Sequence, residues 1–308
     1  MERRKFLKTA AVAGLGASAT TLAAPAIAQE RKTLTIVSTW PRDFPGLGLS
    51  AQRLAARITE LSEGRLTTEY FAAGERVGAF DVFDEVASGN SQAYIGADYY
   101  WVGKHPGWAY YTSVPFGMTT PEWNAWVKFK DGQALWDELA GEFGLKNITC
   151  GGTGTQMGGW FNKEINQLED YKGLKIRMPG LGGEVLRQIG AAAVSLPGGE
   201  IFPSLQSGAI DATEWVGPWN DLAFGFYKVT KYYYYPGFHE PGTALGSGIN
   251  LKVWESLSKE HQTIITDAMA AENNATLAEF NARNNDALDT LTDKHKVILR
   301  KFDEKTLN

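Results

Sequence analysis

Hydrophobic positions along the chain follow two spacings, and stretches of the two kinds alternate. Short runs rich in β-branched residues, such as residues 34–38, predict strands. Longer stretches with apolar residues three or four apart, such as Leu54, Ile58 and Leu61, predict helices. The predicted strands are residues 34–38, 66–71, 93–96, 146–150, 174–177, 191–196, 212–215, 244–251 and 297–299. The predicted helices are residues 50–61, 80–87, 122–139, 183–189, 200–206 and 258–292. This alternation indicates α/β units built on parallel or mixed sheets.

The length and the aromatic content suggest more than one core. About 280 residues follow residue 28, which is more than a single hydrophobic core usually supports, so two domains are expected. The chain has 10 Trp, 12 Tyr and 15 Phe, an excess that is typical either of a walled cavity or of thick core packing. Residues 232–235 are four consecutive tyrosines, which would alternate faces on a strand, so we expect two of the rings in the core.

The first 28 residues resemble an export signal. Arg3 and Arg4 form a twin-arginine start, a run of small and apolar residues follows, and residues 26–28 give a small-x-small cleavage pattern. The alternative is a membrane anchor, but a run rich in Ala, Gly and Thr is weakly hydrophobic for a spanning helix. We therefore expect a protein that is exported folded to the bacterial periplasm and cleaved after about Ala28.

Charge and cysteine content narrow the class of protein. The chain has a net charge of −5, and residues 1–28 contribute about +3, so the remainder is near −8. An acidic surface repels phosphate backbones, so we expect no nucleic-acid partner. Cys150 is the single cysteine, so no disulfide forms within the chain. We interpret it as a small buried apolar residue rather than a reactive thiol.

Four clusters at predicted strand ends or in loops could carry chemistry. They are residues 99–101 (Tyr-Tyr-Trp), the glycine-rich residues 151–160 with Gln156, residues 177–180 and residues 214–220. In α/β sheets, ligands bind beyond the carboxyl ends of the strands, so these clusters can converge. The glycine-rich segment lacks the sequence of a phosphate-binding loop and is better read as a connection between strands or a crossing between domains.

Arg177 and Glu214 are the charged residues in these clusters. Arg177 at a strand end could hold a planar carboxylate by two parallel hydrogen bonds, or could form a structural ion pair. Glu214 could be a general acid, a metal ligand or a surface charge. Glu240, in the turn of residues 239–242, is either solvated, which we favour for a turn carboxylate, or a further cation ligand. The four histidines show no metal-ligand spacing, and no catalytic motif is present.

Residues 173–180, 211–221 and 232–242 together resemble a known family. The first stretch is similar to the signature of the solute receptors of tripartite ATP-independent periplasmic (TRAP) transporters. The other two resemble the subgroup that binds small α-keto or α-hydroxy acids with a metal ion. The resemblance extends from about residue 34 to residue 299. It implies an α/β fold of the periplasmic-binding-protein type, with two α/β domains around a ligand cleft, joined by crossing strands and a long helix.

The resemblance also implies roles for individual residues. Arg177 would hold the carboxylate of the ligand, and the cation, Na⁺ or Ca²⁺, would be held by Gln156, Glu214 and the backbone carbonyl of Trp215. Glu240 stays a candidate further metal ligand on the residue pattern alone. The residues expected around the organic ligand are Tyr100, Gln156, Arg177, Trp215 and Asn220. The partners implied are a small organic acid and the membrane permease subunits of the transporter.

Domain limits follow from the same resemblance. We expect one domain from residues 29–155 with about 241–290, and a second from about 156–240 with about 291–308. Receptors of this subgroup can dimerise through a C-terminal helix, so a homodimer is expected if the full-length protein carries one. A helix start at residues 303–304 followed by the chain end at Asn308 suggests that this helix is missing from the sequence.

Charge counting favours a cation beside the ligand. A monocarboxylate and Glu214 bring two negative charges against one positive charge on Arg177, and Na⁺ makes the buried set neutral, whereas Ca²⁺ leaves it at +1. The leading hypothesis is thus a non-enzymatic receptor for a 2-oxo or 2-hydroxy acid such as pyruvate or lactate. The alternatives are a receptor of the same fold for a dicarboxylate, a sugar acid or an amino acid, and, more remotely, an exported hydrolase in which Glu214 is an acid or base.

Overall fold

The structure is a computed structural model in which residues 31–307 are described. The expected export signal of residues 1–28 lies outside the described residues. Residues from Lys32 onward form one compact unit that contains two sheets. None of the helices in the described range is long and apolar enough to cross a membrane.

The first sheet has five strands in the order β2-β1-β3-β10-β4. Its strands are β1 (Lys32–Ser38), β2 (Leu66–Phe71), β3 (Ala93–Gly96), β4 (Leu145–Gly154) and β10 (Thr243–Asn250). Strand β1 runs parallel to β2 and β3, and β10 runs antiparallel to β3 and β4. The helices of this lobe are α2 (Leu47–Leu61), α3 (Val82–Ala87), α4 (Thr120–Phe129), α5 (Gly132–Glu142) and α9 (Leu251–Ser256), with the 3₁₀ helices η1 (Asp98–Trp101) and η2 (Pro106–Tyr111).

The second sheet has six strands in the order β11-β9-β5-β8-β6-β7. Its strands are β5 (Gly159–Phe161), β6 (Lys175–Arg177), β7 (Ala192–Val194), β8 (Ala212–Thr213), β9 (Tyr232–Tyr235) and β11 (Ile298–Lys301). Strands β6, β7 and β8 are parallel, and β5 is antiparallel to both β8 and β9. The helices of this lobe are α6 (Gly180–Gln188), α7 (Gly198–Ser207), α8 (Pro218–Phe224) and α11 (Glu304–Leu307), with the 3₁₀ helices η3 (Leu168–Tyr171) and η4 (Phe226–Lys228).

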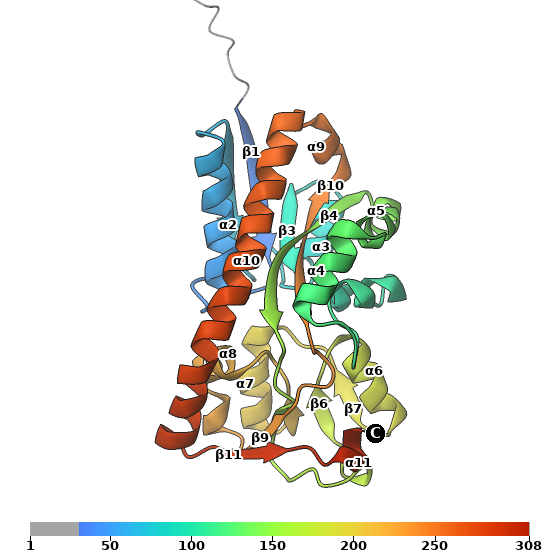
Figure 1. Ribbon diagram of the computed structural model, residues 1–308, viewed down its shortest axis with the longest axis vertical. Coiled ribbons are helices and arrows are strands. Elements are labelled where there is room, and N and C mark those ends of the chain that lie inside the picture. The colour runs from blue at the N-terminus through green and yellow to red at the C-terminus, as the bar shows by residue number, and fades with distance from the viewer. Residues whose placement is uncertain (1–30, 308) are drawn as a thin grey trace, which may run out of the picture. The chain divides into compact units, whose positions relative to one another are not determined.

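The chain crosses between the two sheets three times, through residues 155–158, residues 236–242 and the long helix α10 (Lys259–Asp289) with its π-helical end, η5 (Thr290–Lys294). Helix α10 packs against α2 of the first lobe and α8 of the second, and it runs along both lobes (Figure 1). The first two crossings bond to each other, because the Gln156 amide donates to the Glu240 carbonyl at 3.0 Å and the Gly237 amide donates to the Gln156 carbonyl at 3.1 Å. The strands predicted for each domain thus fall in one sheet each, while the limits themselves stay a prediction.

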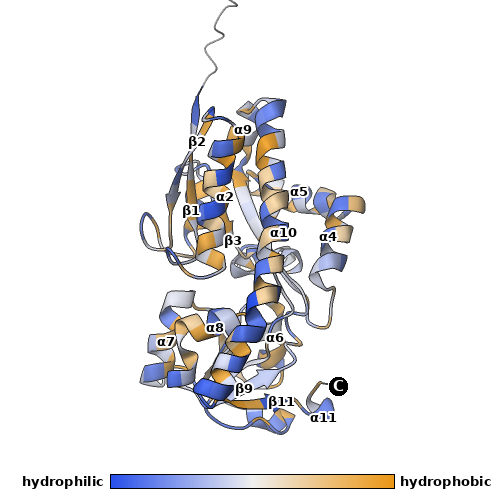
Figure 2. Ribbon diagram, turned by 60° about the vertical axis from the view of Figure 1, so that its left-hand side comes forward, coloured by the Kyte–Doolittle hydropathy of each residue, from blue (hydrophilic) through white to orange (hydrophobic). Residues whose placement is uncertain are grey.

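Apolar burial explains why the two lobes hold together. Aliphatic and aromatic side chains of α2, the sheets and α10 share one core, and α2 and α10 carry both hydrophobic and hydrophilic residues along their length (Figure 2). Tyr233 and Tyr234 are both buried although they point to opposite faces of β9, because both faces of this sheet are covered. The expectation of two buried rings is confirmed, and Cys150 is buried and free as expected.

Two local predictions were wrong. The single helix expected over residues 122–139 is two helices, α4 and α5, because the chain turns at residues 130–131. The turn is tight enough that a Cβ on Gly132 would lie 2.8 Å from both Trp126 and Val127. The glycine-rich connection begins later than expected, since residues 151–154 continue β4. There Gly151 packs against Leu245 of the neighbouring strand.

Candidate functional site

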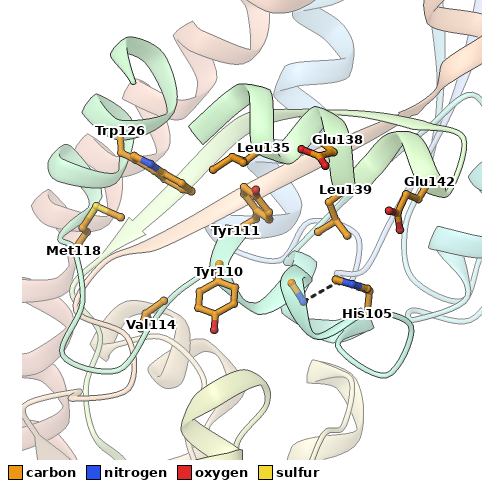
Figure 3. Close-up of a pocket in the computed structure, with 11 residues that line it drawn as sticks. His105, Tyr110, Tyr111, Val114, Met118, Trp126, Leu135, Glu138, Leu139 and Glu142 are labelled. Atoms are coloured by element: carbon orange, nitrogen blue, oxygen red, sulfur yellow. Dashed lines mark hydrogen bonds between the residues drawn. The ribbon is translucent and has the colours of Figure 1, made fainter. Parts of the chain in front are cut away.

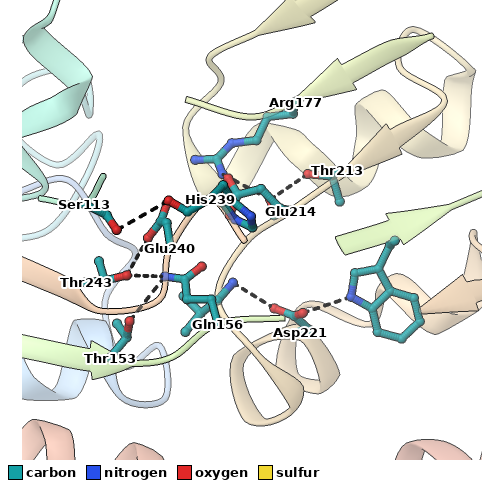
Figure 4. A network of polar contacts seen from close by, with 12 residues as sticks. Ser113, Thr153, Gln156, Arg177, Thr213, Glu214, Asp221, His239, Glu240 and Thr243 are labelled. Carbon is teal, nitrogen blue, oxygen red and sulfur yellow. Dashed lines mark hydrogen bonds and ion pairs between the residues drawn. The ribbon is translucent and has the colours of Figure 1, made fainter. Parts of the chain in front are cut away.

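Polar side chains from both sheets and from both strand crossings converge on one buried cluster (Figure 4). Arg177 ends β6, and Glu214 directly follows β8, its parallel neighbour. Gln156 lies on the first crossing, and His239 and Glu240 lie on the second. All five side chains are buried, with relative exposures between 0 and 4%. Burying so many polar groups costs free energy unless each has a partner, so their contacts are informative.

Arg177 is tied to Glu214. Its Nη1 donates to the Glu214 carboxylate and, at 3.0 Å, to the Glu214 carbonyl, while its Nε donates to the Leu196 carbonyl at 3.2 Å. The guanidinium lies over the Trp215 ring, 5.0 Å from the centroid. Nη2 is buried and has no hydrogen-bond partner. The sequence left open whether Arg177 forms an ion pair or receives a carboxylate; the structure has the ion pair and leaves one nitrogen, Nη2, without a partner.

His239 joins the cluster although no sequence pattern pointed to it. Its Nε2 lies 3.3 Å from the second carboxylate oxygen of Glu214, and its Nδ1 has no partner. Burial alone would lower the pKa of His239, but the hydrogen bond and charge of Glu214 outweigh burial and raise the pKa above its ordinary value. The histidine is therefore a donor that orients Glu214.

Gln156 and Glu240 present free oxygens to the same cluster. Gln156 Nε2 donates to the hydroxyls of Thr153 at 3.2 Å and Thr243 at 3.1 Å, and the Thr243 hydroxyl donates to Glu240 at 2.5 Å. These bonds leave Gln156 Oε1 and Glu240 Oε1 buried without a partner. The orientation of the Gln156 amide is thus fixed, with its oxygen directed away from the two threonines.

The preferred interpretation of Glu240 as a solvated turn residue was wrong. Its exposure is 2%, because the turn is enclosed between the two lobes as part of the second crossing. Burial, followed by the nearby charge of Glu214, raises the pKa of Glu240 to about 7. A buried carboxyl group with an unpartnered oxygen lowers the stability of the fold, but the same oxygen can bind a cation.

The donor set suits a hard cation. Ligand atoms of Glu214, His239 and Glu240 all lie within 4.8 Å of one another. Carboxylate, amide and backbone oxygens are the ligands that Na⁺ and Ca²⁺ prefer, and a cation here would satisfy the free oxygens of Gln156 and Glu240. The residues present therefore fit the cation that the resemblance implies.

The three remaining predicted ligand residues have different surroundings. Trp215 and Tyr100 line a cavity of about 10 Å³ together with Gln156, enough for about one water. Burial raises the pKa of Tyr100, and the positive charge of Arg177 acts against it, which places the two groups within electrostatic reach. Asn220 does not line this cavity; its Nδ2 donates to the Pro45 carbonyl at 2.9 Å, and its Oδ1 is buried without a partner.

A second pocket, on the first lobe, is larger but unsuited to an anion. It has a volume of about 470 Å³ and lies between η2 and helices α4 and α5 (Figure 3). Its walls are mostly apolar, and its charged groups are the carboxylates of Glu138 and Glu142, with His105 as the one basic side chain. Such a pocket repels a carboxylate, so the buried cluster around Arg177 is the candidate site.

Comparison with known proteins assigns the family. The model of the bacterial extracellular solute-binding proteins, family 7 (DctP), matches residues 37–308. The chain belongs to this family. The similar proteins of this family include solute receptors of TRAP transporters, which confirms the resemblance seen in the motifs. The protein therefore belongs to an extracytoplasmic class of solute-binding proteins.

Three relatives are informative. A monocarboxylate 2-oxoacid-binding periplasmic protein of Nostoc sp. is 39% identical over 94% of this chain and 81% of its own length. A TRAP solute-binding protein of Pseudoalteromonas atlantica, solved with sodium and pyruvate, is 39% identical with a TM-score of 0.88, covering 90% of this chain and 84% of that one. One from Colwellia psychrerythraea, solved with calcium and pyruvate, is 39% identical with a TM-score of 0.87 at the same coverage.

These structures confirm the predicted fold of two α/β domains of the periplasmic-binding-protein type. They also show that similar receptors bind either sodium or calcium together with the organic acid.

Proposed function

We propose that this receptor captures a small 2-oxo or 2-hydroxy monocarboxylate, such as pyruvate or lactate, together with Na⁺ or Ca²⁺. It then delivers the acid to the membrane permease subunits of a TRAP transporter. The observation that carries the proposal is the unpartnered Nη2 of Arg177, buried in the same cluster as the unpartnered oxygens of Gln156 and Glu240. Relatives solved with pyruvate and either cation support it.

Positively charged and oxygen-bearing residues of the site would bind different parts of the ligand pair. Arg177 would bind the carboxylate, while Glu214, Glu240, Gln156 and the Trp215 carbonyl would hold the cation. When bound, the cation would supply positive charge to the keto or hydroxy end of the acid. The ring of Trp215, already stacked on the guanidinium, and Tyr100 would form the apolar wall that excludes water.

Burial of Glu240 adds a second carboxyl group to the charge count of the site. With Glu240 ionised and His239 neutral, Arg177 and Ca²⁺ balance the two glutamates and one monocarboxylate. With Glu240 protonated, Na⁺ gives the same balance. Because burial raises the pKa of Glu240 to about 7, both cations remain compatible with the site near neutral pH.

A short monocarboxylate fits better than a dicarboxylate. Arg177 is the one arginine or lysine among the buried residues of the described chain. The second carboxylate of a long diacid would find no fixed cation and would be buried unpaired, which costs several kcal/mol. Receptors of this fold for sugar acids or amino acids remain the alternative.

Calorimetry with a panel of two- to six-carbon acids tests the proposal. We expect pyruvate or lactate to bind in the presence of Ca²⁺ or Na⁺ and to raise the melting temperature, because a ligand of the folded state stabilises that state. A preference for a dicarboxylate or a sugar acid would contradict the proposal. Mass spectrometry of the recovered ligand tests the further expectation that the receptor binds without catalysis; turnover would revive the hydrolase alternative.

The export route and the oligomeric state are also part of this proposal. Residues 1–28 would direct folded export by the twin-arginine route, and N-terminal sequencing of the exported protein tests cleavage after about Ala28. A homodimer would form if the full-length protein carries a further C-terminal helix, and sedimentation of that protein tests it.

A further inference from the structure

The peptide between Trp215 and Val216 is held by the carboxylate of Asp221. The Val216 amide donates to Asp221 Oδ1 at 3.2 Å, and the Val216 carbonyl accepts from the Met157 amide at 3.0 Å. The second bond ties the next peptide, Val216–Gly217, to the residue after Gln156, so two proposed cation ligands, Gln156 and the Trp215 carbonyl, come from directly bonded segments.

Asp221 is itself held rigidly. Its second oxygen, Oδ2, accepts from Trp160 Nε1 at 2.9 Å and from the Tyr233 hydroxyl at 2.7 Å. The two donor rings belong to neighbouring strands β5 and β9 and stack with centroids 4.0 Å apart. Asp221 is 1% exposed, and its carboxylate accepts hydrogen bonds from these three donors among residues 31–307. The sheet thus fixes the carboxylate, and the carboxylate fixes the peptide.

Fixing Val216 N–H also fixes Trp215 C=O. The peptide unit is planar and trans, so its N–H and C=O point in nearly opposite directions. With the N–H directed at Asp221, the Trp215 carbonyl is directed away from Asp221. Among residues 31–307 this carbonyl accepts no hydrogen bond, which leaves its lone pairs available.

We propose that Asp221 is a positioning residue for the cation, acting through the Trp215–Val216 peptide. This inference rests on the proposed function, since it assigns an outer-shell group to the proposed cation site. Groups that orient metal ligands typically change metal affinity by about 10- to 100-fold when they are removed. Among residues 31–307, the Asp221 carboxylate forms no hydrogen bond with the side chains of the proposed cation ligands or of Arg177, so its effect should fall on the cation rather than on the acid.

The test is titration of the exported protein with Ca²⁺ by calorimetry, first alone and then with saturating pyruvate. Asp221→Ala should raise the half-saturating Ca²⁺ concentration by about tenfold or more. Asp221→Asn keeps an oxygen that can accept from Val216 N–H but turns an NH2 toward Trp160 Nε1–H, so it should raise half-saturation less than Asp221→Ala does. At saturating Ca²⁺, pyruvate affinity in both variants should be unchanged.

Asp98 supplies a matched control. It is a second buried carboxylate with the same kind of donors, accepting from Trp136 Nε1 at 2.9 Å and from the Tyr94 hydroxyl at 3.2 Å, but it belongs to the first lobe. Asp98→Ala should lower stability as Asp221→Ala does and leave the Ca²⁺ titration unchanged. An equal effect of both variants on Ca²⁺ would mean that Asp221 acts only through general stability, and would overturn the proposal.

The outcomes separate the inference from the function. If the unaltered protein binds Ca²⁺ and folded Asp221→Ala binds it equally well, the inference fails and the proposed function stands. If the unaltered protein binds neither Ca²⁺ nor pyruvate, both fail. Should Asp221→Ala not fold, Tyr233→Phe removes one of the bonds that hold Asp221; it should raise half-saturation about threefold, and no change would overturn the proposal.

Discussion

Arg177 and Glu214 form an ion pair in which neither side chain has any exposed surface. The pair comes from adjacent parallel strands, since Arg177 is opposite Thr213 in the register of β6 and β8. Glu214 occupies Nη1 of the guanidinium and the Leu196 carbonyl occupies Nε, so an incoming carboxylate can take two parallel hydrogen bonds only if one of them gives up its nitrogen. A cation that attracts Glu214 would free Nη1, and this exchange would couple binding of the cation to binding of the acid.

The first prediction concerns the removal of Arg177. Arg177→Met should destabilise the protein by about 3–5 kcal/mol, because it leaves the Glu214 carboxylate buried without the guanidinium, its fully charged partner. The double variant Arg177→Met with Glu214→Gln should recover most of that loss. Denaturant unfolding measures both. Neither variant should bind pyruvate in calorimetry, and unaltered pyruvate affinity in the single variant would remove Arg177 from the site.

Glu214→Gln tests the link between cation and acid. In the unaltered protein, Ca²⁺ should strengthen pyruvate binding. Without the charge of Glu214, the cation loses its main anionic ligand while Arg177 is free, so the enhancement by Ca²⁺ should fall at least about tenfold. Paired pyruvate titrations with Ca²⁺ and with a chelator measure the enhancement. An equal enhancement in both proteins would show that Glu214 does not couple the ligands.

Gly180 is where the second lobe meets the aromatic loop of the first. Its φ is +62°, and a Cβ there would lie 2.5 Å from the Tyr99 ring. Gly180→Ala should therefore press the lobes apart and weaken pyruvate binding by about tenfold, mainly through faster dissociation. Stopped-flow fluorescence measures that rate.

Gly74→Ala is the control for backbone strain in that experiment. Gly74 has a similar positive φ of +81°, but nothing lies within 4 Å of the position of a Cβ. It should cost about 1 kcal/mol of stability and leave dissociation unchanged. If both variants release pyruvate at the same faster rate, the contact with Tyr99 is not the cause.

Burial of Asp98 should make the stability of the protein depend on pH. Burial raises its pKa to about 7 in the folded state from an ordinary value of 3.8, so the folded protein binds the proton more tightly. Stability should consequently fall as the pH rises from about 4 to about 7, by up to a few kcal/mol, and then level off. Asp98→Asn should reduce the slope of this part of the profile, which Glu240 also contributes to, as measured by urea unfolding between pH 4.5 and 8. An unchanged slope would rule out Asp98 as its source.

The sequence was sufficient for the parts of the site that follow from neighbouring strands. Arg177 ends β6, and Glu214 directly follows β8. Because the carboxyl ends of adjacent parallel strands lie side by side, the pattern alone was enough to expect that these two residues converge. The order of helices and strands was predictable for the same reason, since apolar spacing is a local property.

The remainder depends on long-range packing. His239 and Glu240 enter the site because residues 236–242 are enclosed between the lobes, where the Gln156 amide bonds to the Glu240 carbonyl. No local spacing indicates that a His-Glu turn will be buried, and turn carboxylates usually face water. The sequence did not indicate the break between α4 and α5, because apolar residues continue at helical spacing through it and the close packing of Gly132 against Trp126 is seen only in the fold.

The three crossings of the chain have a practical consequence for anyone who would dissect this receptor. Each sheet is completed by a stretch of sequence from far along the chain, β10 in the first and β11 in the second. No single cut in the gene can yield an isolated lobe with all its strands. Separate production of either half would require stitching two distant pieces of the gene together, with a new linker across the severed connections.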